Sequence, residues 1–156
     1  MIEFPPSFDC IIPPESNNIG GLYLGDIFTA ERIEVLKEKN ISAVLTVASD
    51  TYLTFENTHV SEHKIIPAED TFYFNLAHFF EEGYDFIEEK RKKHNILVHC
   101  FAGVSRSATI VIAYLMKKNE WKFLKSLKYV KDRRFVISPN LGFKKQLQEY
   151  EYKLKN

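Results

Sequence analysis

The sequence is poor in cysteine, and this shortage excludes one class of small protein. Its 156 residues include two cysteines, Cys10 and Cys100, which could form at most one disulfide bond. A scaffold held together by disulfides needs more, so we expect a reducing compartment, the cytoplasm first and the nucleus as an alternative. A zinc site is also disfavoured, because no second cysteine lies near Cys100 and the chain has only five histidines.

Long apolar runs are missing as well. No run is long and uniform enough to span a bilayer, and the first residues, MIEFPPSFDC, lack the basic and apolar regions of a secretory signal. We therefore expect no membrane partner. A hydrophobic content of 45% and a charged content of 27% are typical of a globular protein with a sizeable core.

The formal net charge of zero hides an uneven distribution of charge. Residues 1–89 carry 4 basic and 17 acidic side chains, whereas residues 90–156 carry 17 basic and 4 acidic ones. One interpretation is a chance partition within a mixed surface. The other is an anion-attracting face built by the C-terminal half.

Strand-like and helix-like segments alternate after residue 20. Apolar and β-branched segments predict strands near 22–24, 41–48, 62–66 and 96–99. Helical spacing and capping residues predict helices beginning at Thr29, Asn75, Arg106, Trp121 and Ser138. The alternation predicts an α/β fold with a central, mostly parallel sheet flanked by helices. Residues 1–19, which are rich in proline, are expected to form an irregular lead-in to a single domain of residues 20–156.

The segment HCFAGVSRS, residues 99–107, interrupts two apolar stretches with polar and flexible residues. Cys100 ends a predicted strand and Arg106 begins a helix, at the edge where open α/β sheets bind ligands. Gly103 can adopt the positive φ that a tight curl needs. The curled backbone would point its N–H groups at one tetrahedral oxyanion, and Arg106 would close this nest with a bidentate contact. The nest would be lined by Phe101, Ala102, Gly103, Val104 and Ser105.

The same environment would turn Cys100 into a nucleophile. A helix N-terminus and a nearby cation favour the thiolate over the thiol. Ser107 could donate its hydroxyl to the sulfur and ease departure of the thiolate. His99 cannot be the base for Cys100, because adjacent strand residues point to opposite faces, so we expect it to orient the loop by hydrogen bonds. The competing interpretation is that Cys100 is an inert core residue.

The pattern His99-Cys100-x-x-Gly103-x-x-Arg106-Ser107 resembles the signature loop of the cysteine-dependent protein phosphatases. Residues 21–25, 69–80, 98–116 and 138–147 are similar to the corresponding segments of compact, atypical dual-specificity phosphatases. This resemblance implies hydrolysis of phosphotyrosine and phosphoserine/threonine through a cysteinyl-phosphate, without a metal or another cofactor. It also implies a phosphoprotein partner. We expect the chain to act as a monomer.

The residues alone do not determine the general acid that the leaving group needs. The candidates that end a strand or loop are Asp26, Asp50, Glu69 and Asp70. By resemblance, Asp70 matches the acid of the family, with Glu69 as the neighbouring alternative. Asn140 matches a residue thought to brace the phosphate loop, although a role at the start of a helix would also explain it.

The variable positions of the loop bear on the substrate. Phe101, Ala102, Val104 and Ser105 are not basic, whereas phosphoinositide phosphatases of this superfamily tend to have lysines there. Phosphoproteins are therefore expected, and nucleic acid is not. The alternatives are a phosphatase of a lipid, a glycan or an RNA 5′ end, and a phosphate-binding module without turnover. Such a module would be expected to lack one of the four residues Cys100, Arg106, Ser107 and Asp70.

Overall fold

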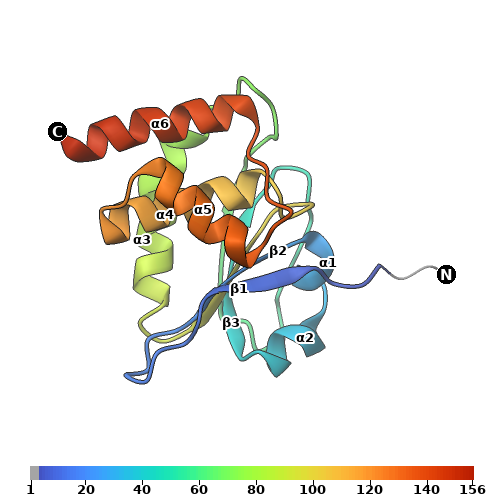
Figure 1. Ribbon diagram of the computed structural model, residues 1–156. Helices are drawn as coiled ribbons and strands as arrows, with labels where there is room; N and C mark the ends of the chain where they lie inside the picture. Colours follow the sequence, from blue (N-terminus) through green and yellow to red (C-terminus); the bar gives the residue numbers. More distant parts are fainter. Residues whose placement is uncertain (1–3) are drawn as a thin grey trace.

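The computed structural model describes residues 4–156, and its centre is a five-stranded sheet with the order β1-β2-β5-β3-β4 (Figure 1). Neighbouring strands β2, β5, β3 and β4 run parallel, and β1 pairs antiparallel with β2. The predicted α/β fold with a mostly parallel sheet is confirmed. The strands are β1 (Phe8–Ile12), β2 (Leu22–Gly25), β3 (Ile41–Val47), β4 (Glu62–Ile66) and β5 (Asn95–His99).

The expectation of an irregular segment over residues 1–19 is wrong for residues 8–12, which form β1. Two pairs of prolines flank this strand, at positions 5–6 and 13–14. Proline cannot donate to a strand ladder, so it is tolerated outside the paired stretch. The intervening FDCII contains β-forming residues and extends the edge of the sheet beside β2.

Helices cover both faces of the sheet. Figure 1 shows α1 and α2 on one face and α3, α4, α5 and α6 on the other. No helix within residues 4–156 is both long and apolar enough to cross a membrane. The helices are α1 (Ile27–Ala30), α2 (Ile33–Glu38), the 3-10 turn η1 (Leu76–Phe79), α3 (Phe80–Lys90), α4 (Arg106–Asn119), α5 (Phe123–Arg133) and α6 (Leu141–Lys155).

Three predicted helix starts are displaced. Asp26 and Asn140 provide the caps for two of these helices, and the helix expected at Trp121 is α5, which begins at Phe123. The single helix expected from Thr29 is divided in two. Helix α1 begins at Ile27, where the carboxylate of Asp26 accepts a hydrogen bond from the Thr29 amide at 2.9 Å, and α2 begins at Ile33. The last helix begins at Leu141, not at Ser138, and is capped by Asn140. The predicted starts at Asn75 and Arg106 are confirmed, although a 3-10 turn follows Asn75 before α3.

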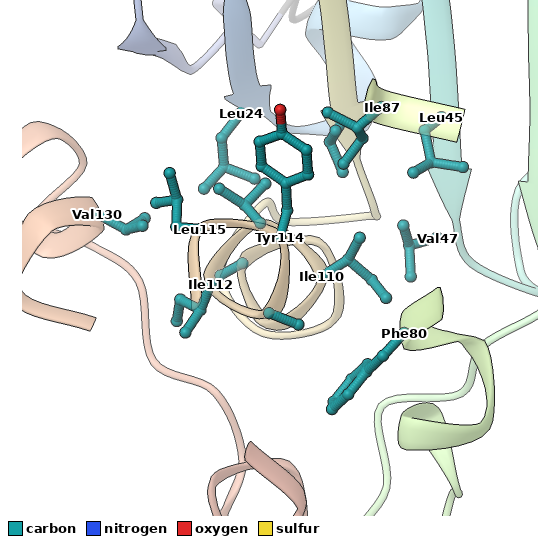
Figure 2. Packing of buried hydrophobic residues seen from close by; sticks show 14 of the residues in the cluster. Leu24, Leu45, Val47, Phe80, Ile87, Ile110, Ile112, Tyr114, Leu115 and Val130 are labelled. Atoms are coloured by element: carbon teal, nitrogen blue, oxygen red, sulfur yellow. The ribbon is translucent and has the colours of Figure 1, made fainter. Parts of the chain in front are cut away.

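The alternation of side chains along the strands divides the core into two layers. In β5, Ile96 and Val98 belong to the layer under α4, whereas Leu97 belongs to the layer under α1 and α2. Helix α4 is buried almost all round, as its apolar sequence predicts. Figure 2 shows α4 side chains packed among residues of the sheet, α3 and α5. This packing holds the N-terminus of α4 firmly against the end of β5. The residues labelled there are Leu24, Leu45, Val47, Phe80, Ile87, Ile110, Ile112, Tyr114, Leu115 and Val130.

Candidate active site

Residues 100–105, called the phosphate loop below, connect β5 to α4. The side chain of Cys100 is buried, but its sulfur faces polar groups of the loop. The Gly103 amide donates a hydrogen bond to Sγ at 3.3 Å, and the Ser107 hydroxyl oxygen lies 3.0 Å from the same sulfur. A cysteine that served only to fill the core would not need these two contacts. The geometry therefore supports the interpretation of Cys100 as a nucleophile.

Gly103 has the positive φ that the sequence predicts, at 68°. The loop also passes very close to the end of β2 at this point. A Cβ atom on residue 103 would lie 2.4 Å from the carbonyl oxygen of Gly25, which is closer than two such atoms can approach. Glycine is thus required both by the backbone angle and by the space.

Arg134 supports the phosphate loop from behind, and sequence reasoning missed it. It is only 2% exposed, and its Nε donates a hydrogen bond to the Gly103 carbonyl at 2.8 Å. A second, longer hydrogen bond of 3.4 Å reaches the Ala102 carbonyl. An ion pair of 2.9 Å with Asp9 on β1 fixes the guanidinium. Because C=O and N–H point in opposite directions along a peptide, holding these carbonyls outward turns the following amides inward.

Arg106, the first residue of α4, is buried and paired with Asp50. Its Nη1 donates hydrogen bonds to the Asp50 carboxylate at 2.8 Å and to the Ala68 carbonyl at 3.1 Å. The hydrogen bond from Arg106 lowers the pKa of Asp50 below its usual value. Asp50 is therefore a poor candidate for the general acid. Its ionised carboxylate instead holds the guanidinium beside the phosphate loop.

Asp70 lies against the far end of the phosphate loop. Its Oδ1 accepts a hydrogen bond from the Ser105 hydroxyl at 2.8 Å and another from the Asn140 side-chain amide at 2.9 Å. The remaining carboxylate candidates lie elsewhere. Asp26 is buried as the cap of α1, and Glu69 is exposed. The geometry thus favours Asp70 as the acid, in agreement with the resemblance.

Asn140 combines the two roles that the sequence left open. Its side-chain oxygen accepts a hydrogen bond from the Phe143 amide at 2.9 Å and so caps α6. Its backbone amide donates to the Ser105 hydroxyl at 3.1 Å, and its side-chain nitrogen donates to Asp70. Asn140 therefore connects the start of α6 to the phosphate loop and to Asp70.

His99 is completely buried and hydrogen-bonds to the carbonyl oxygen of Cys100 through Nδ1 at 2.9 Å. The carbonyl can only accept, so Nδ1 carries the proton. In the neutral ring, Nε2 then accepts from the Thr46 hydroxyl at 2.7 Å, and Thr46 accepts from Nε2 of His63 at 2.8 Å. The hydrogen bond between His99 and the loop, which the sequence predicts, is thus the first of a chain of hydrogen bonds that continues through Thr46 to His63. Sequence reasoning missed both, because they lie on other strands.

We expect the buried His99 to make the protein less stable in mild acid. Burial lowers its pKa to about 4, whereas an unfolded chain has a histidine pKa of about 6.5. Between these values the unfolded state binds a proton that the folded state does not, so stability falls as pH decreases. The loss should approach about 3 kcal/mol at the lower end. Urea unfolding at pH 7 and pH 4.5 would measure it.

The matched control for this measurement is a His99→Asn variant, which has no group titrating at this position. Its free energy of unfolding should depend less steeply on pH over the same interval. Burial also lowers the pKa of His63, but that contribution is common to both proteins. Parallel curves for the two proteins would contradict the assignment to His99.

Cys10 is too far from Cys100 for a disulfide bond without movement of the backbone. Cys10 pairs with Tyr23 on β2, and Tyr23 pairs with Leu97, three residues before Cys100. The two strand spacings from β1 to β5 alone separate the Cα atoms of Cys10 and Cys100 by about 10 Å. This exceeds the Cα–Cα limit of roughly 7 Å for a disulfide bond. Both cysteines are free thiols.

Within residues 4–156, acidic, histidine and cysteine side chains form no group of three that could hold a metal ion.

Comparison with known proteins places this geometry in a family. The family described as "Dual specificity phosphatase, catalytic domain" matches residues 22–153. The chain is 46% identical over 133 residues to Dual specificity protein phosphatase 1 of Arabidopsis thaliana, covering 84% of this chain and 66% of that protein. It is 40% identical over 151 residues to Dual specificity protein phosphatase 5 of Rattus norvegicus, covering 96% of this chain and 38% of that protein. The chain therefore spans about two thirds or less of these relatives.

Solved structures agree with this assignment over the whole fold. Human DUSP28 superposes with a TM-score of 0.85 at 27% identity, covering 100% of both chains. The human tyrosine phosphatase-like serine/threonine/tyrosine-interacting protein gives a TM-score of 0.84 at 30% identity, covering 96% of this chain and 98% of that one. With the family match over residues 22–153, these results show that the chain belongs to the dual specificity phosphatase catalytic-domain family.

Proposed function

We propose that the chain is a protein phosphatase that hydrolyses phosphotyrosine and phosphoserine/threonine through a cysteinyl-phosphate. The observation that carries the proposal is the environment of Cys100. Its sulfur lies at the N-terminus of α4, in contact with the Gly103 amide and the Ser107 hydroxyl. This position stabilises negative charge on sulfur, and the inward amides of the loop can bind the phosphoryl oxygens of the substrate.

In the first step the thiolate of Cys100 attacks phosphorus, and the bond from phosphorus to the substrate oxygen breaks. Arg106 and the backbone amides of residues 101–105 bind the three equatorial oxygens. Asp70 gives its proton to the leaving oxygen, which departs as a neutral alcohol or phenol. Both observed contacts of Asp70 are made by Oδ1, so Oδ2 is the oxygen available to carry this proton.

In the second step water attacks the cysteinyl-phosphate. Asp70, now ionised, takes a proton from that water, and the phosphorus–sulfur bond breaks. The Ser107 hydroxyl, 3.0 Å from the sulfur, can donate a hydrogen bond to the departing thiolate. Inorganic phosphate leaves, and the enzyme regains a thiolate and a protonated Asp70. Cysteine, arginine and carboxylate supply every role, so the proposed reaction includes no cofactor.

The arrangement of side chains supports turnover over mere binding of phosphate. A binding module needs the loop amides and Arg106, but it has no need of an acid held across the loop. Here Asp70 is held at the end of the loop by one hydrogen bond from Ser105 and another from Asn140. The relatives named as protein phosphatases support phosphoprotein substrates.

The proposal extends to the setting in which the enzyme acts. The candidate catalytic residues come from one chain, which supports action as a monomer. A nucleophilic thiolate needs reducing conditions, which supports the cytoplasm and, as an alternative, the nucleus. Neither nucleic acid nor a membrane is part of the proposed reaction.

A comparison of substrates tests this function. Phosphate release should be measured from peptides carrying phosphotyrosine or phosphothreonine, from a phosphoinositide and from an RNA 5′ phosphate. We expect the phosphopeptides to be hydrolysed with kcat/KM at least about 10-fold above the other substrates, and vanadate to inhibit competitively as a phosphate mimic. Preference for the lipid or RNA would overturn the protein substrate, and binding without release of phosphate would overturn the enzyme.

A further inference from the structure

Exposed apolar side chains gather around the phosphate loop. Five of the residues that form or support this loop are Asp50, Asp70, Cys100, Arg134 and Asn140. Each is followed within three residues by a large apolar side chain that is exposed. Single exposed apolar residues are ordinary, but their concentration at one edge of a fold marks an interaction site. Seven of the twelve large apolar side chains exposed in the described chain are of this kind: Tyr52, Phe72, Tyr73, Phe101, Phe135, Val136 and Leu141.

One aromatic patch adjoins the start of the phosphate loop. Phe101 directly follows Cys100, and its ring meets the ring of Phe28 edge to face at 6.2 Å. Phe28 in turn stacks on Phe4 at 5.1 Å, and Arg32 donates a hydrogen bond to the Phe4 carbonyl at 3.0 Å. The Phe101 carbonyl accepts a hydrogen bond from the Ile27 amide at 2.9 Å. Phe4, Phe28 and Phe101 therefore form a fixed strip, called the α1 patch below.

A second patch adjoins the end of the loop. Phe72 and Tyr73 follow Asp70, are both exposed, and have ring centroids 5.3 Å apart. The Phe72 backbone lies against Gly142, where an added Cβ would be 2.1 Å from the Phe72 carbonyl oxygen. The exposed Leu141 is thereby brought next to Phe72. Phe72, Tyr73 and Leu141 form the second strip, called the α6 patch below.

The two patches lie on opposite sides of the phosphate loop. The α1 patch packs on α1, which covers one face of the sheet, and the α6 patch lies at the start of α6, which packs on α4 on the other side of the sheet (Figure 1). The loop at the sheet edge lies between them. A protein segment whose phosphorylated residue enters the loop would therefore contact one patch on each side.

The two arginines that contact the phosphate loop are not free to bind acidic flanking residues. Arg106 is paired with Asp50, and Arg134 is buried below the loop and paired with Asp9. Glu69 is exposed beside Asp70. Both arginines that contact the loop are thus already paired with a carboxylate, so neither is free to bind acidic groups outside the phosphate itself.

We propose that the substrate is a phosphoprotein segment with large apolar side chains on both sides of the phosphorylated residue, held by the α1 and α6 patches. This inference rests on the proposed phosphatase function. Each flanking side chain that becomes buried against a patch should raise kcat/KM by about 10-fold, which corresponds to the transfer of one large apolar side chain out of water.

The test uses phosphotyrosine peptides that differ only in the residues next to the phosphotyrosine. These positions are leucine and phenylalanine in one peptide, alanine in the second and glutamate in the third. We expect kcat/KM to be at least about 10-fold higher for the apolar peptide than for the alanine peptide, and lowest for the glutamate peptide. A small aryl phosphate, which has no flanking residues, serves as the reference substrate.

Variants then assign the preference to the patches. Phe4→Ser in the α1 patch and Tyr73→Ser in the α6 patch should each reduce the apolar-to-alanine ratio several-fold and leave hydrolysis of the aryl phosphate unchanged. Tyr152→Ser is the matched control, because Tyr152 is 73% exposed on the last turns of α6, outside both patches. It should preserve the ratio.

The outcomes separate this inference from the proposed function. Equal rates for the three peptides, with the aryl phosphate hydrolysed, would overturn the inference alone. A preference that both patch variants retain would also overturn it. Self-association that Tyr73→Ser abolishes, without any preference among peptides, would show that the surface binds a second copy instead. Failure to hydrolyse the aryl phosphate would refute the phosphatase function itself.

Discussion

Replacing Cys100 by serine should lower turnover of an aryl phosphate by roughly 10⁴-fold or more, the scale on which removal of a nucleophile acts. Serine keeps the size of the side chain and its contacts with Gly103 and Ser107, which lie 3.3 and 3.0 Å from the sulfur. A hydroxyl in this position remains protonated at neutral pH, so it is a far weaker nucleophile than a thiolate. The variant should therefore bind phosphate without reacting.

Two measurements distinguish loss of chemistry from loss of folding. Release of phosphate reports turnover, and calorimetric titration with vanadate or with a phosphotyrosine peptide reports binding. Cys10→Ser is the matched control, because Cys10 is exposed on β1 and lies two strands away. This control should retain full activity. Activity near the wild-type level in Cys100→Ser would contradict the assignment of the nucleophile.

Replacing Asp70 by asparagine should slow hydrolysis by roughly 10²- to 10⁴-fold, the contribution of a general acid. Asparagine can still accept hydrogen bonds from Ser105 and Asn140 through its carbonyl oxygen, so the loop contacts survive. The proton for the leaving group is lost. The defect should therefore be largest for alkyl phosphates, which leave poorly, and should shrink for aryl phosphates whose phenols are acidic.

The dependence of the rate on the acidity of the leaving group measures this effect. The rate of Asp70→Asn should depend on that acidity more steeply than the rate of the wild-type protein. Glu69→Gln is the control, because Glu69 is the exposed neighbour of Asp70. If Glu69→Gln showed the leaving-group dependence and Asp70→Asn did not, the acid would be Glu69.

The phosphate loop was predictable because its parts are contiguous in the chain. A strand, a tight curl and a helix start are local features, and the glycine at position 103 has the backbone angle that the curl demands. The carboxylates posed a different problem. Asp26, Asp50 and Asp70 occupy similar positions between elements. The neighbouring sequence does not indicate that the first caps a helix, the second pairs with an arginine and the third is the candidate acid. Their contacts with Thr29, Arg106 and Ser105 separate them.

The supporting residues were beyond the reach of sequence patterns for the same reason. Arg134 follows a helix rich in lysine, and its local context gives no sign that it is buried under residues 102 and 103. Its partner Asp9 lies on β1, a strand hidden between prolines. Thr46 and His63 come from β3 and β4, and only the parallel register brings them to His99.

The amino-acid sequence by itself determined the fold class, the candidate phosphate loop and the candidate nucleophile, because short-range periodicity and one continuous motif specify all three. Only the tertiary structure decided which carboxylate faces the loop, which side chains hold its carbonyls outward and which apolar residues surround it. These are contacts between residues far apart in the chain, such as Asp9 and Arg134, which are 125 positions apart, and they exist only once the sheet has assembled.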